Sequence, residues 1–402
     1  MMRIAKIETF LMRAAWPGTP MPHAPDSRDT RHWCFIRIHT DEGVTGVGEG
    51  SGWPRLVEQG VQDLSALLLG EDPFDIERLW QKMMIATMGH GMTGTVGGGV
   101  MTAIETALWD IKGKALGTPV WNLLGGRVRD RVRVYAHARD AEQARALVDR
   151  GYTALKCGGI DGIVDKVGSL RAAVGADIDL MVDLHGPPWL TASDAIAIGR
   201  ALESHHLLFL EDPVAPEVPS ALRRVRDALD LPIAAGERLS RLWSYAPLIA
   251  EGLIDVVQPD TGRAGGISQL RKIAGLAEAY GVMVAPHSGS LGPVAEYAAL
   301  HVLASIPNAL ILETFADDCS SRYEVVDPVP RVEAGHMLVP DAPGLGVELV
   351  VEEIGRHPPA ANCGVPGSAL ARTYEPGTFN EHVYVQTRWR RASSFGTNSE
   401  GR

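Results

Sequence analysis

Cysteine is scarce in this 402-residue sequence, and no two cysteines lie close together. The four positions are Cys34, Cys157, Cys319 and Cys363. This spacing argues against a disulfide framework or a C-x-x-C zinc site and suits a reducing compartment. The sequence also lacks any run of 18 consecutive apolar residues, so we expect no membrane span. The stretch Met1–Glu8 interrupts its apolar residues with charge and has no signal-peptide core. We therefore expect a cytoplasmic protein.

Positive charge is also in short supply. Lysine and arginine number 38 against 49 aspartates and glutamates, which gives a net charge of −11. Nucleic acid and anionic membranes are therefore not expected as partners. A small anionic substrate remains compatible with this charge, because one bound metal ion can reverse the field inside a pocket. Hydrophobic residues make up 45% of the chain, enough for a sizeable core.

Between about residues 130 and 315, short β-type runs alternate with stretches of helical periodicity. The predicted strands are Val132–Ala136, Ala154–Cys157, Leu180–Asp183, Leu207–Glu211, Ile233–Gly236, Val256–Gln258, Val282–Ala285 and Ala309–Leu312. Eight strands that alternate with helices predict parallel βαβ units that close into a barrel. An open doubly wound sheet is the alternative.

The first 125 residues follow a different pattern, with strands first and helices afterwards. The expected elements are strands at Lys6–Met12, Cys34–Thr40 and Val44–Glu49 and helices at Leu56–Leu69 and Gly99–Leu116. This order is typical of an α+β unit. The glycine-rich run at 94–99 lacks the pattern of a phosphate loop, and we interpret it as a flexible turn before the second helix.

Three successive barrel strands each end in a carboxylate. Asp183, Glu211 and Glu237 follow one another at intervals of 28 and 26 residues, roughly one βα unit. Barrel enzymes carry their chemistry at the C-terminal strand ends, where these side chains would converge. Three convergent carboxylates cannot all stay ionised without a cation, and oxygen ligands suit Mg²⁺. Each residue alone could instead be a helix N-cap, but that explanation fits three in successive units poorly.

The sequence resembles the mandelate racemase and muconate lactonizing group of the enolase superfamily. The matching runs are Met101–Val120 (MTAIETALWDIKGKALGTPV), Phe209–Pro213 (FLEDP), Ala235–Arg238 (AGER) and Pro343–Val347 (PGLGV). The resemblance covers roughly residues 3–350. It implies an α/β fold in which a modified TIM barrel (126–325) lies under an α+β capping domain (1–125), completed by the C-terminal segment (326–402). It also implies Mg²⁺ held by the three carboxylates, and a symmetric homo-oligomer.

Candidate acid and base residues lie at the remaining strand ends. Asp260 on the sixth strand and His287 on the seventh can form an oriented pair, in which the carboxylate raises the basicity of the imidazole. His287 would remove the proton α to a carboxylate, while Mg²⁺ and Glu313, at the end of the eighth strand, stabilise the enediolate. This combination of a base and Mg²⁺ is the general scheme of the superfamily. A lone histidine at a strand end is more often structural, but this one has a partner.

His185 distinguishes between branches of the group. It lies two residues after Asp183, and strand alternation directs both side chains to the same side. The run Asp183–Gly186 (DLHG) resembles the galactonate dehydratase branch, in which this histidine is the general acid. A histidine that only orients Asp183 is the alternative.

Lys156 marks a departure from the racemases of the group. Those enzymes carry Lys-x-Lys on the second barrel strand, whereas this chain has Lys156-Cys157-Gly158. A racemase that uses that second lysine as a base is therefore not expected. Lys156 either contacts the substrate carboxylate or is only a strand residue whose stem lies along apolar surface while its charged end reaches solvent.

These observations together predict a dehydratase that eliminates water, syn or anti, from a sugar acid and yields a 2-keto-3-deoxy acid. The first rival is an epimerase, in which His185 returns a proton to the opposite face. The second is a metal-binding relative without catalysis.

Overall fold

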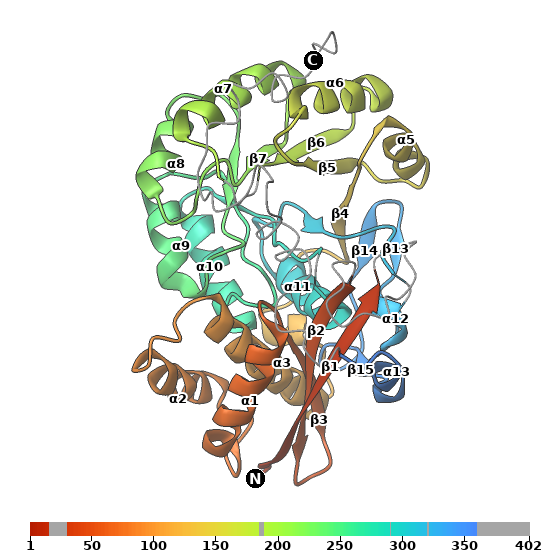
Figure 1. Ribbon diagram of the computed structural model, residues 1–402. Coiled ribbons are helices and arrows are strands. Elements are labelled where there is room, and N and C mark those ends of the chain that lie inside the picture. The colour runs from red at the N-terminus through yellow and green to blue at the C-terminus, as the bar shows by residue number, and fades with distance from the viewer. Residues whose placement is uncertain (16–29, 185–188, 290, 320, 360–402) are drawn as a thin grey trace.

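The computed structural model describes residues 1–15, 30–184, 189–289, 291–319 and 321–359, and it contains the predicted barrel (Figure 1). Its eight parallel strands are β4 (Arg131–His137), β5 (Ala154–Gly158), β6 (Asp179–Asp183), β7 (Phe209–Glu211), β8 (Ile233–Ala235), β9 (Val256–Val257), β10 (Met283–Val284) and β11 (Leu312–Glu313). Each strand pairs with the next as far as β10, β11 pairs with β4, and a bridge between Val284 and Ala309 closes the circle. The open-sheet alternative is therefore wrong.

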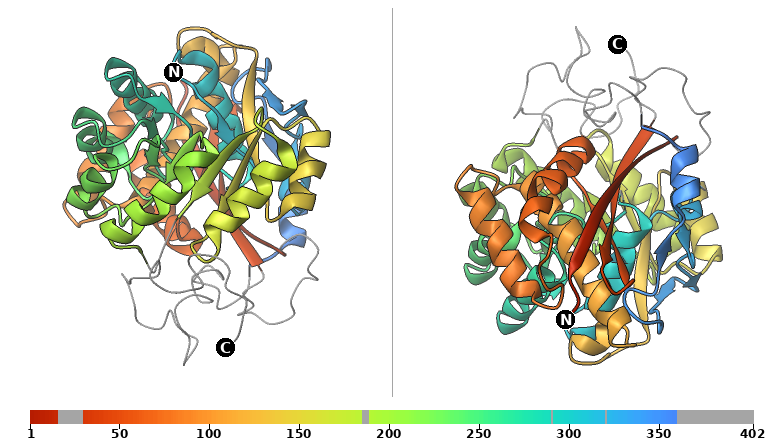
Figure 2. Two further views of the ribbon diagram at one scale, coloured as in Figure 1. Left: turned by 90° about the horizontal axis from the view of Figure 1, so that it is seen from above. Right: turned by 90° about the horizontal axis from the view of Figure 1, so that it is seen from below.

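Helices surround these strands in Figure 1, and Figure 2 shows the same molecule from above and from below. They are α5 (Ala141–Asp149), α6 (Ile163–Val174), α7 (Ala192–Leu202) with the 3₁₀ turn η1 (Glu203–His205), α8 (Pro219–Arg226), α9 (Arg241–Ala250), α10 (Ile267–Ala279) and α11 (Pro293–Ser305). None of the described helices combines the length and apolarity needed to cross a bilayer.

The barrel interior is apolar below its C-terminal end. Each strand or its flank contributes one buried side chain to this layer: Tyr135, Ala154, Met181, Phe209, Ala234, Val256, Ala285 and Ile311. Side chains two residues apart on a strand point to the same side. Met181 and Phe209 therefore place Asp183 and Glu211 one layer higher, at the mouth of the barrel. The hydrophobic pattern of the strands thus fixes the position of the charged residues.

The capping domain contains the three antiparallel strands β1 (Ile4–Ala15), β2 (Thr30–Thr40) and β3 (Thr45–Gly50) and the helices α1 (Pro54–Leu68), α2 (Ile76–Met88) and α3 (Thr95–Ala115). The sequence analysis missed α2. A short helix, α4 (Val120–Leu123), leads into the barrel. Figure 1 shows this domain packed against one side of the barrel, next to α10 and α11.

The glycine-rich run lies inside α3 except for Gly94, which precedes the first helical residue, so its interpretation as a flexible turn is wrong. Close packing explains these glycines. A Cβ on Gly98 would lie 2.2 Å from the Arg263 carbonyl oxygen, and one on Gly99 would lie 2.2 Å from that of Ser51. The absence of side chains lets α3 approach both backbones.

The C-terminal elements extend both parts of the fold. They are α12 (Ser321–Glu324), β12 (Val326–Asp327), β13 (Val332–Glu333), β14 (His336–Leu338), β15 (Glu348–Leu349) and α13 (Val351–Arg356). β14 pairs with β4 of the barrel, and the chain beyond α13 contacts β1, where the Arg13 amide donates to the His357 carbonyl at 2.9 Å.

Two buried glutamates of the capping domain accept hydrogen bonds from the first amides of two barrel helices. Glu105 on α3 accepts from the Ile267 and Ser268 amides at the start of α10, at 2.7 and 2.9 Å. Glu49 on β3 accepts from the Gly292 and Ala295 amides at the start of α11. Burial raises the pKa of each glutamate to about 7, against the effect of the amide donors.

These raised pKa values predict that stability falls as the pH rises. The folded chain keeps a proton on Glu105 that the unfolded chain, with a pKa near 4.5, has released. The contribution is therefore complete below pH 4.5 and is lost as the pH rises through about 7, at a cost of about 3 kcal/mol. Urea unfolding of wild type and Glu105→Gln at pH 5 and pH 8 measures this loss. We expect a smaller loss in the variant, and an equal loss in both proteins would contradict the assignment.

Candidate active site

Ionisable side chains from all eight strands converge at the C-terminal end of the barrel. In strand order they are His137, Lys156, Asp183, Glu211, Glu237, Asp260, His287 and Glu313. Seven of them were predicted from the sequence, and His137 was missed. The eighth predicted residue, His185, lies outside the described residues.

Lys156 lies at the centre of the carboxylates. Its Nζ is 2.9 Å from Glu211 Oε2, 2.8 Å from Glu313 Oε1 and 3.3 Å from Asp183 Oδ2. The side chain is only 2% exposed, and burial by itself would lower its pKa. The charges of Glu211 and Glu313 outweigh burial, so the pKa of Lys156 lies well above its ordinary value. Lys156 is thus a permanent cation bound to three acids, which rules out a solvent-directed strand residue.

Glu211 carries the clearest sign that more positive charge belongs here. Its Oε1 is buried without a hydrogen-bond partner, although Oε2 is paired with Lys156. Burial and the neighbouring charge of Asp183 raise the pKa of Glu211 to about 7, against the effect of Lys156. Buried polar atoms are nearly always satisfied in folded proteins, so an orphaned carboxylate oxygen at this place needs an explanation.

Glu237 pairs with two other cationic groups, His287 and Arg238. Its Oε2 lies 3.1 Å from His287 Nε2, and its Oε1 lies 3.0 Å from an Arg238 guanidinium nitrogen. Burial alone would raise the pKa of Glu237, but the charges of His287 and Arg238 lower it. Within the described ranges, no three His, Cys, Asp or Glu side chains already surround one cation position. The reason is that these carboxylates turn toward Lys156, His287 and Arg238.

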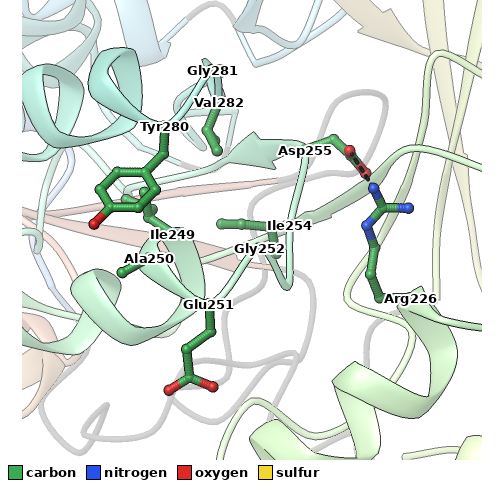
Figure 3. Close-up of a pocket in the computed structure, with 10 residues that line it drawn as sticks. All are labelled: Arg226, Ile249, Ala250, Glu251, Gly252, Ile254, Asp255, Tyr280, Gly281 and Val282. Carbon is green, nitrogen blue, oxygen red and sulfur yellow. Dashed lines mark hydrogen bonds and ion pairs between the residues drawn. The ribbon is translucent and has the colours of Figure 1, made fainter.

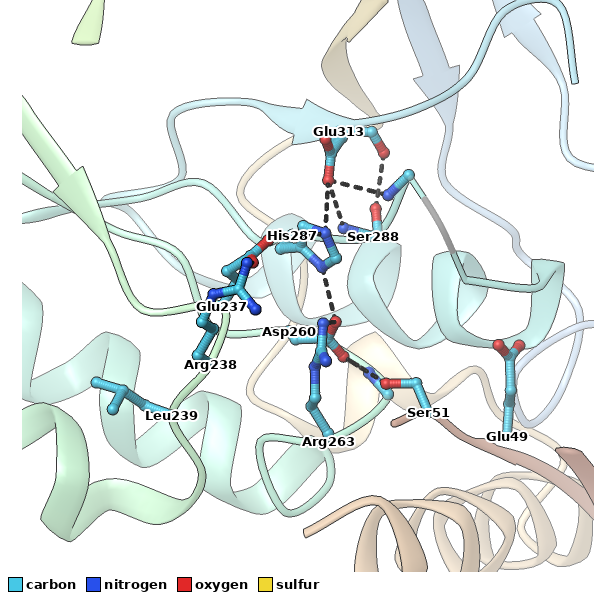
Figure 4. A network of polar contacts seen from close by, with 12 residues as sticks. Glu49, Ser51, Glu237, Arg238, Leu239, Asp260, Arg263, His287, Ser288 and Glu313 are labelled. Carbon is cyan, nitrogen blue, oxygen red and sulfur yellow. Dashed lines mark hydrogen bonds and ion pairs between the residues drawn. The ribbon is translucent and has the colours of Figure 1, made fainter. Parts of the chain in front are cut away.

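His287 and Asp260 form the predicted pair. His287 Nδ1 is 2.6 Å from Asp260 Oδ2, and Nε2 points toward Glu237 and Glu313 (Figure 4). Burial alone would lower the pKa of His287, but the charges of Glu313 and Glu237 and the bond to Asp260 raise it to about 9. Asp260 is fully buried, and the charge of Arg263 holds its pKa below the ordinary value, against burial. The pair is therefore an oriented imidazolium whose Nε2 faces the acids.

Glu313 is held on both oxygens. Oε1 lies 2.9 Å from His137 Nε2, and Oε2 accepts from the Ser288 and Gly289 amides at 3.0 Å each. Burial opposes ionisation, but Lys156 and His287 hold the pKa of Glu313 well below its usual range. An ionised Glu313 accepts hydrogen bonds, so donation to an enediolate requires a proton that these surroundings disfavour.

His137 completes this wall of the site. Its ring stacks on Phe315 with 4.2 Å between ring centroids and 5° between planes. Its side chain is 26% exposed, so the ring is still open to solvent. His137 directly follows the predicted strand Val132–Ala136, and this strand-end position is the sequence signal that identifies it.

A pocket of ≈ 390 Å³ lies at the other end of the barrel (Figure 3). Ile254, Asp255 and Val282 line it just before β9 and β10 begin. Asp255 is engaged there by Arg226 at 3.0 Å. None of the predicted site residues lines this pocket, and the convergent chemistry lies at the opposite strand ends.

Comparison with known proteins identifies the family. Residues 6–125 match the mandelate racemase / muconate lactonizing enzyme N-terminal domain, and residues 139–354 match the enolase C-terminal domain-like family. The chain belongs to the enolase superfamily. Its fold is accordingly a modified TIM barrel with a capping domain.

Several relatives of this enolase superfamily member are named D-galactonate dehydratase. The D-galactonate dehydratase of Variovorax paradoxus (strain S110) is 38% identical over 356 residues, which cover 81% of this chain and 92% of that protein. The D-galactonate dehydratase of Ralstonia nicotianae (strain ATCC BAA-1114 / GMI1000) is 38% identical over 345 residues, which cover 79% of this chain and 88% of that protein.

Solved structures agree with this assignment. The 3,6-anhydro-D-galactonate cycloisomerase of Zobellia galactanivorans has a TM-score of 0.80 and 31% identity, covering 88% of this chain and 99% of that one. An enolase superfamily member from Salmonella Typhimurium has a TM-score of 0.79 and 29% identity, covering 89% and 99%.

The contacts of Lys156 predict that its removal destabilises the protein. Lys156→Met would leave three buried carboxylates without their shared cation, and breaking a buried ion pair in this way costs about 3–5 kcal/mol. Urea unfolding in the presence of EDTA measures the loss. Lys272→Met is the control, because it removes an exposed pair with Glu77 worth at most about 1 kcal/mol. Equal effects of the two substitutions would refute the central role of Lys156.

Proposed function

We propose that this enzyme removes water from galactonate or a closely related aldonate and forms a 2-keto-3-deoxy acid, with Mg²⁺ as its cofactor. Similarity to several D-galactonate dehydratases supports the broader statement that the chain is a hydro-lyase of the acid-sugar dehydratase class. The observation that carries the mechanism is the His287–Asp260 pair, which faces the buried carboxylates at the barrel mouth.

Asp183, Glu211 and Glu237 would hold the magnesium ion. The donor set consists of carboxylate oxygens, which a hard divalent cation prefers. The unpartnered Glu211 Oε1 and the mutual repulsion of Glu211 and Asp183 both favour a cation there. When bound, the cation supplies positive charge to the oxyanion that develops on the substrate and to the surroundings of His287, whose pKa it lowers.

His287 then acts as the general base. Its Nε2 takes the proton from the carbon next to the substrate carboxylate, while Nδ1–H remains directed at Asp260. Asp260 fixes the tautomer and stabilises the imidazolium that forms. We assign to Lys156 a share in binding the substrate carboxylate, because its ammonium group is fixed at the barrel mouth. Glu313 holds Lys156 and His137 in place, and it contacts the enediolate only in a protonated form.

His185 is the proposed general acid. It donates a proton to the β-hydroxyl, which leaves as water, and the enol that remains becomes the 2-keto-3-deoxy acid. In the sequence His185 follows Asp183 by two residues, and the described neighbour Leu184 is buried. In an epimerase the same proton would go to carbon, and no keto acid would form.

The proposal predicts a Mg²⁺-dependent keto acid. Wild type is incubated with a library of mono- and diacid sugars, and semicarbazide detects the 2-keto product. We expect galactonate or a near relative to react, EDTA to abolish the reaction, and His287→Asn to lower kcat by at least about 10³-fold, because the base is lost. His336→Asn, on β14, serves as the control with unchanged activity.

The variant His185→Asn tests whether His185 is the general acid or only orients Asp183. As the general acid, His185 is needed for loss of water but not for proton removal. We therefore expect the variant to exchange the α proton with D₂O while it forms little keto acid. Loss of both activities would contradict the acid role and favour a histidine that orients Asp183. Epimerised substrate without keto acid from wild type would refute the dehydratase proposal.

A further inference from the structure

The Asp260 carboxylate accepts three hydrogen bonds and forms an ion pair with Arg263, and one of the hydrogen bonds comes from the capping domain. Oδ2 is bound by His287 Nδ1 at 2.6 Å and by an Arg263 guanidinium nitrogen at 2.7 Å. Oδ1 accepts from the Gly262 amide at 2.8 Å and from the Ser51 hydroxyl at 3.0 Å. Figure 4 shows Ser51 reaching Asp260 from the side away from His287.

The backbone of Ser51 is fixed where it contacts the barrel. Ser51 directly follows β3, and its amide donates to the Gly262 carbonyl at 2.8 Å. A Cβ on Gly262 would lie 2.8 Å from Ser51 Cβ, and one on Gly99 would lie 2.2 Å from the Ser51 carbonyl oxygen. Two residues earlier, Glu49 is bound to the start of α11. The docking of β3 against the loop after β9 therefore fixes the Ser51 backbone from which the hydroxyl reaches Asp260.

We propose that Ser51 is a positioning residue that orients His287 through Asp260. Each Asp260 oxygen has two polar partners, so the carboxylate plane cannot rotate, and the imidazole bound to Oδ2 is aimed by that plane. Without the Ser51 hydroxyl, Oδ1 keeps only the Gly262 amide, and the carboxylate gains freedom to tilt. This inference rests on the proposed role of His287 as the base. It adds that the base is aligned only while the capping domain is docked.

Low-field proton NMR tests the alignment without any substrate. The full chain with Mg²⁺ should show an imidazole N–H signal from the short bond between His287 and Asp260, assigned by its loss in His287→Asn. We expect this signal to shift or broaden in Ser51→Ala. It should persist in Lys272→Met, which removes a different contact between α2 and α10. An unchanged signal in Ser51→Ala would overturn the proposal, whatever the substrate of the enzyme is.

Kinetics with the active sugar acid provide the second readout. A slightly misaimed base costs on the order of 10- to 100-fold in kcat, and KM should stay within about twofold because alignment affects the reaction step. The isotope effect with α-deuterated substrate should rise in Ser51→Ala, because proton removal becomes slower. Ser51→Thr, which keeps the hydroxyl, should recover at least part of kcat.

The outcomes separate this inference from the proposed function. If wild type forms keto acid and His287→Asn does not, the base assignment stands. In that case an unchanged kcat in Ser51→Ala overturns the positioning role alone. A raised KM with unchanged kcat also overturns it, because Ser51 would then contact the substrate directly. Equal losses in Ser51→Ala and Lys272→Met would show a general loosening of the two domains.

Discussion

The structure depends on a concentration of buried negative charge at the mouth of the barrel. Asp183, Glu211, Glu237 and Glu313 lie within one ring of strand ends. Among the described residues, Lys156 contacts three of them, and His287 lies close to Glu237 and Glu313. Like charges at this distance raise one another's pKa unless cations compensate them. Lys156 therefore stabilises the ring, and the unpartnered Glu211 oxygen is the atom that the proposed cation would bind. In the proposed chemistry, a cation held by this excess negative charge would stabilise the oxyanion on the substrate.

The second constraint is the set of hydrogen bonds that joins the capping domain to the barrel. Glu49 and Glu105 bind the N-termini of α11 and α10, where free amides and the helix dipole favour an acceptor. Ser51 follows in the same docked segment and reaches Asp260. Domain docking and alignment of the base are thus parts of one contact surface.

Sequence reasoning recovered the parts that repeat along the chain. The βα alternation predicted all eight strands, and the carboxylates at Asp183, Glu211 and Glu237 followed from their position at successive strand ends. The observed strand ends differ from the predicted ones by a few residues. The difference is largest at β11, because the pairing of β11 with β4 sets its register. Helix α2 was missed, although its buried face packs into the capping core.

Contacts between distant segments could not be predicted. The sequence predicted Lys156 as a substrate ligand or a simple strand residue. Its contacts with Glu211 and Glu313 were not predicted, because they form only when the barrel closes. The glycines of α3 resembled a turn, because the backbones that crowd them belong to Ser51 and Arg263, far away in sequence. Ser51 itself carries no local signal, since its partner is 209 residues away.

The most direct test of the central claim is a crystal structure of the protein soaked in Mn²⁺, read by anomalous scattering. The account predicts one strong peak between Asp183, Glu211 and Glu237, with the Glu211 Oε1 atom among its ligands. It also predicts that Lys156 keeps its contact with Glu313. A peak elsewhere, or none at this place while Lys156 still joins Asp183 to Glu211, would contradict it.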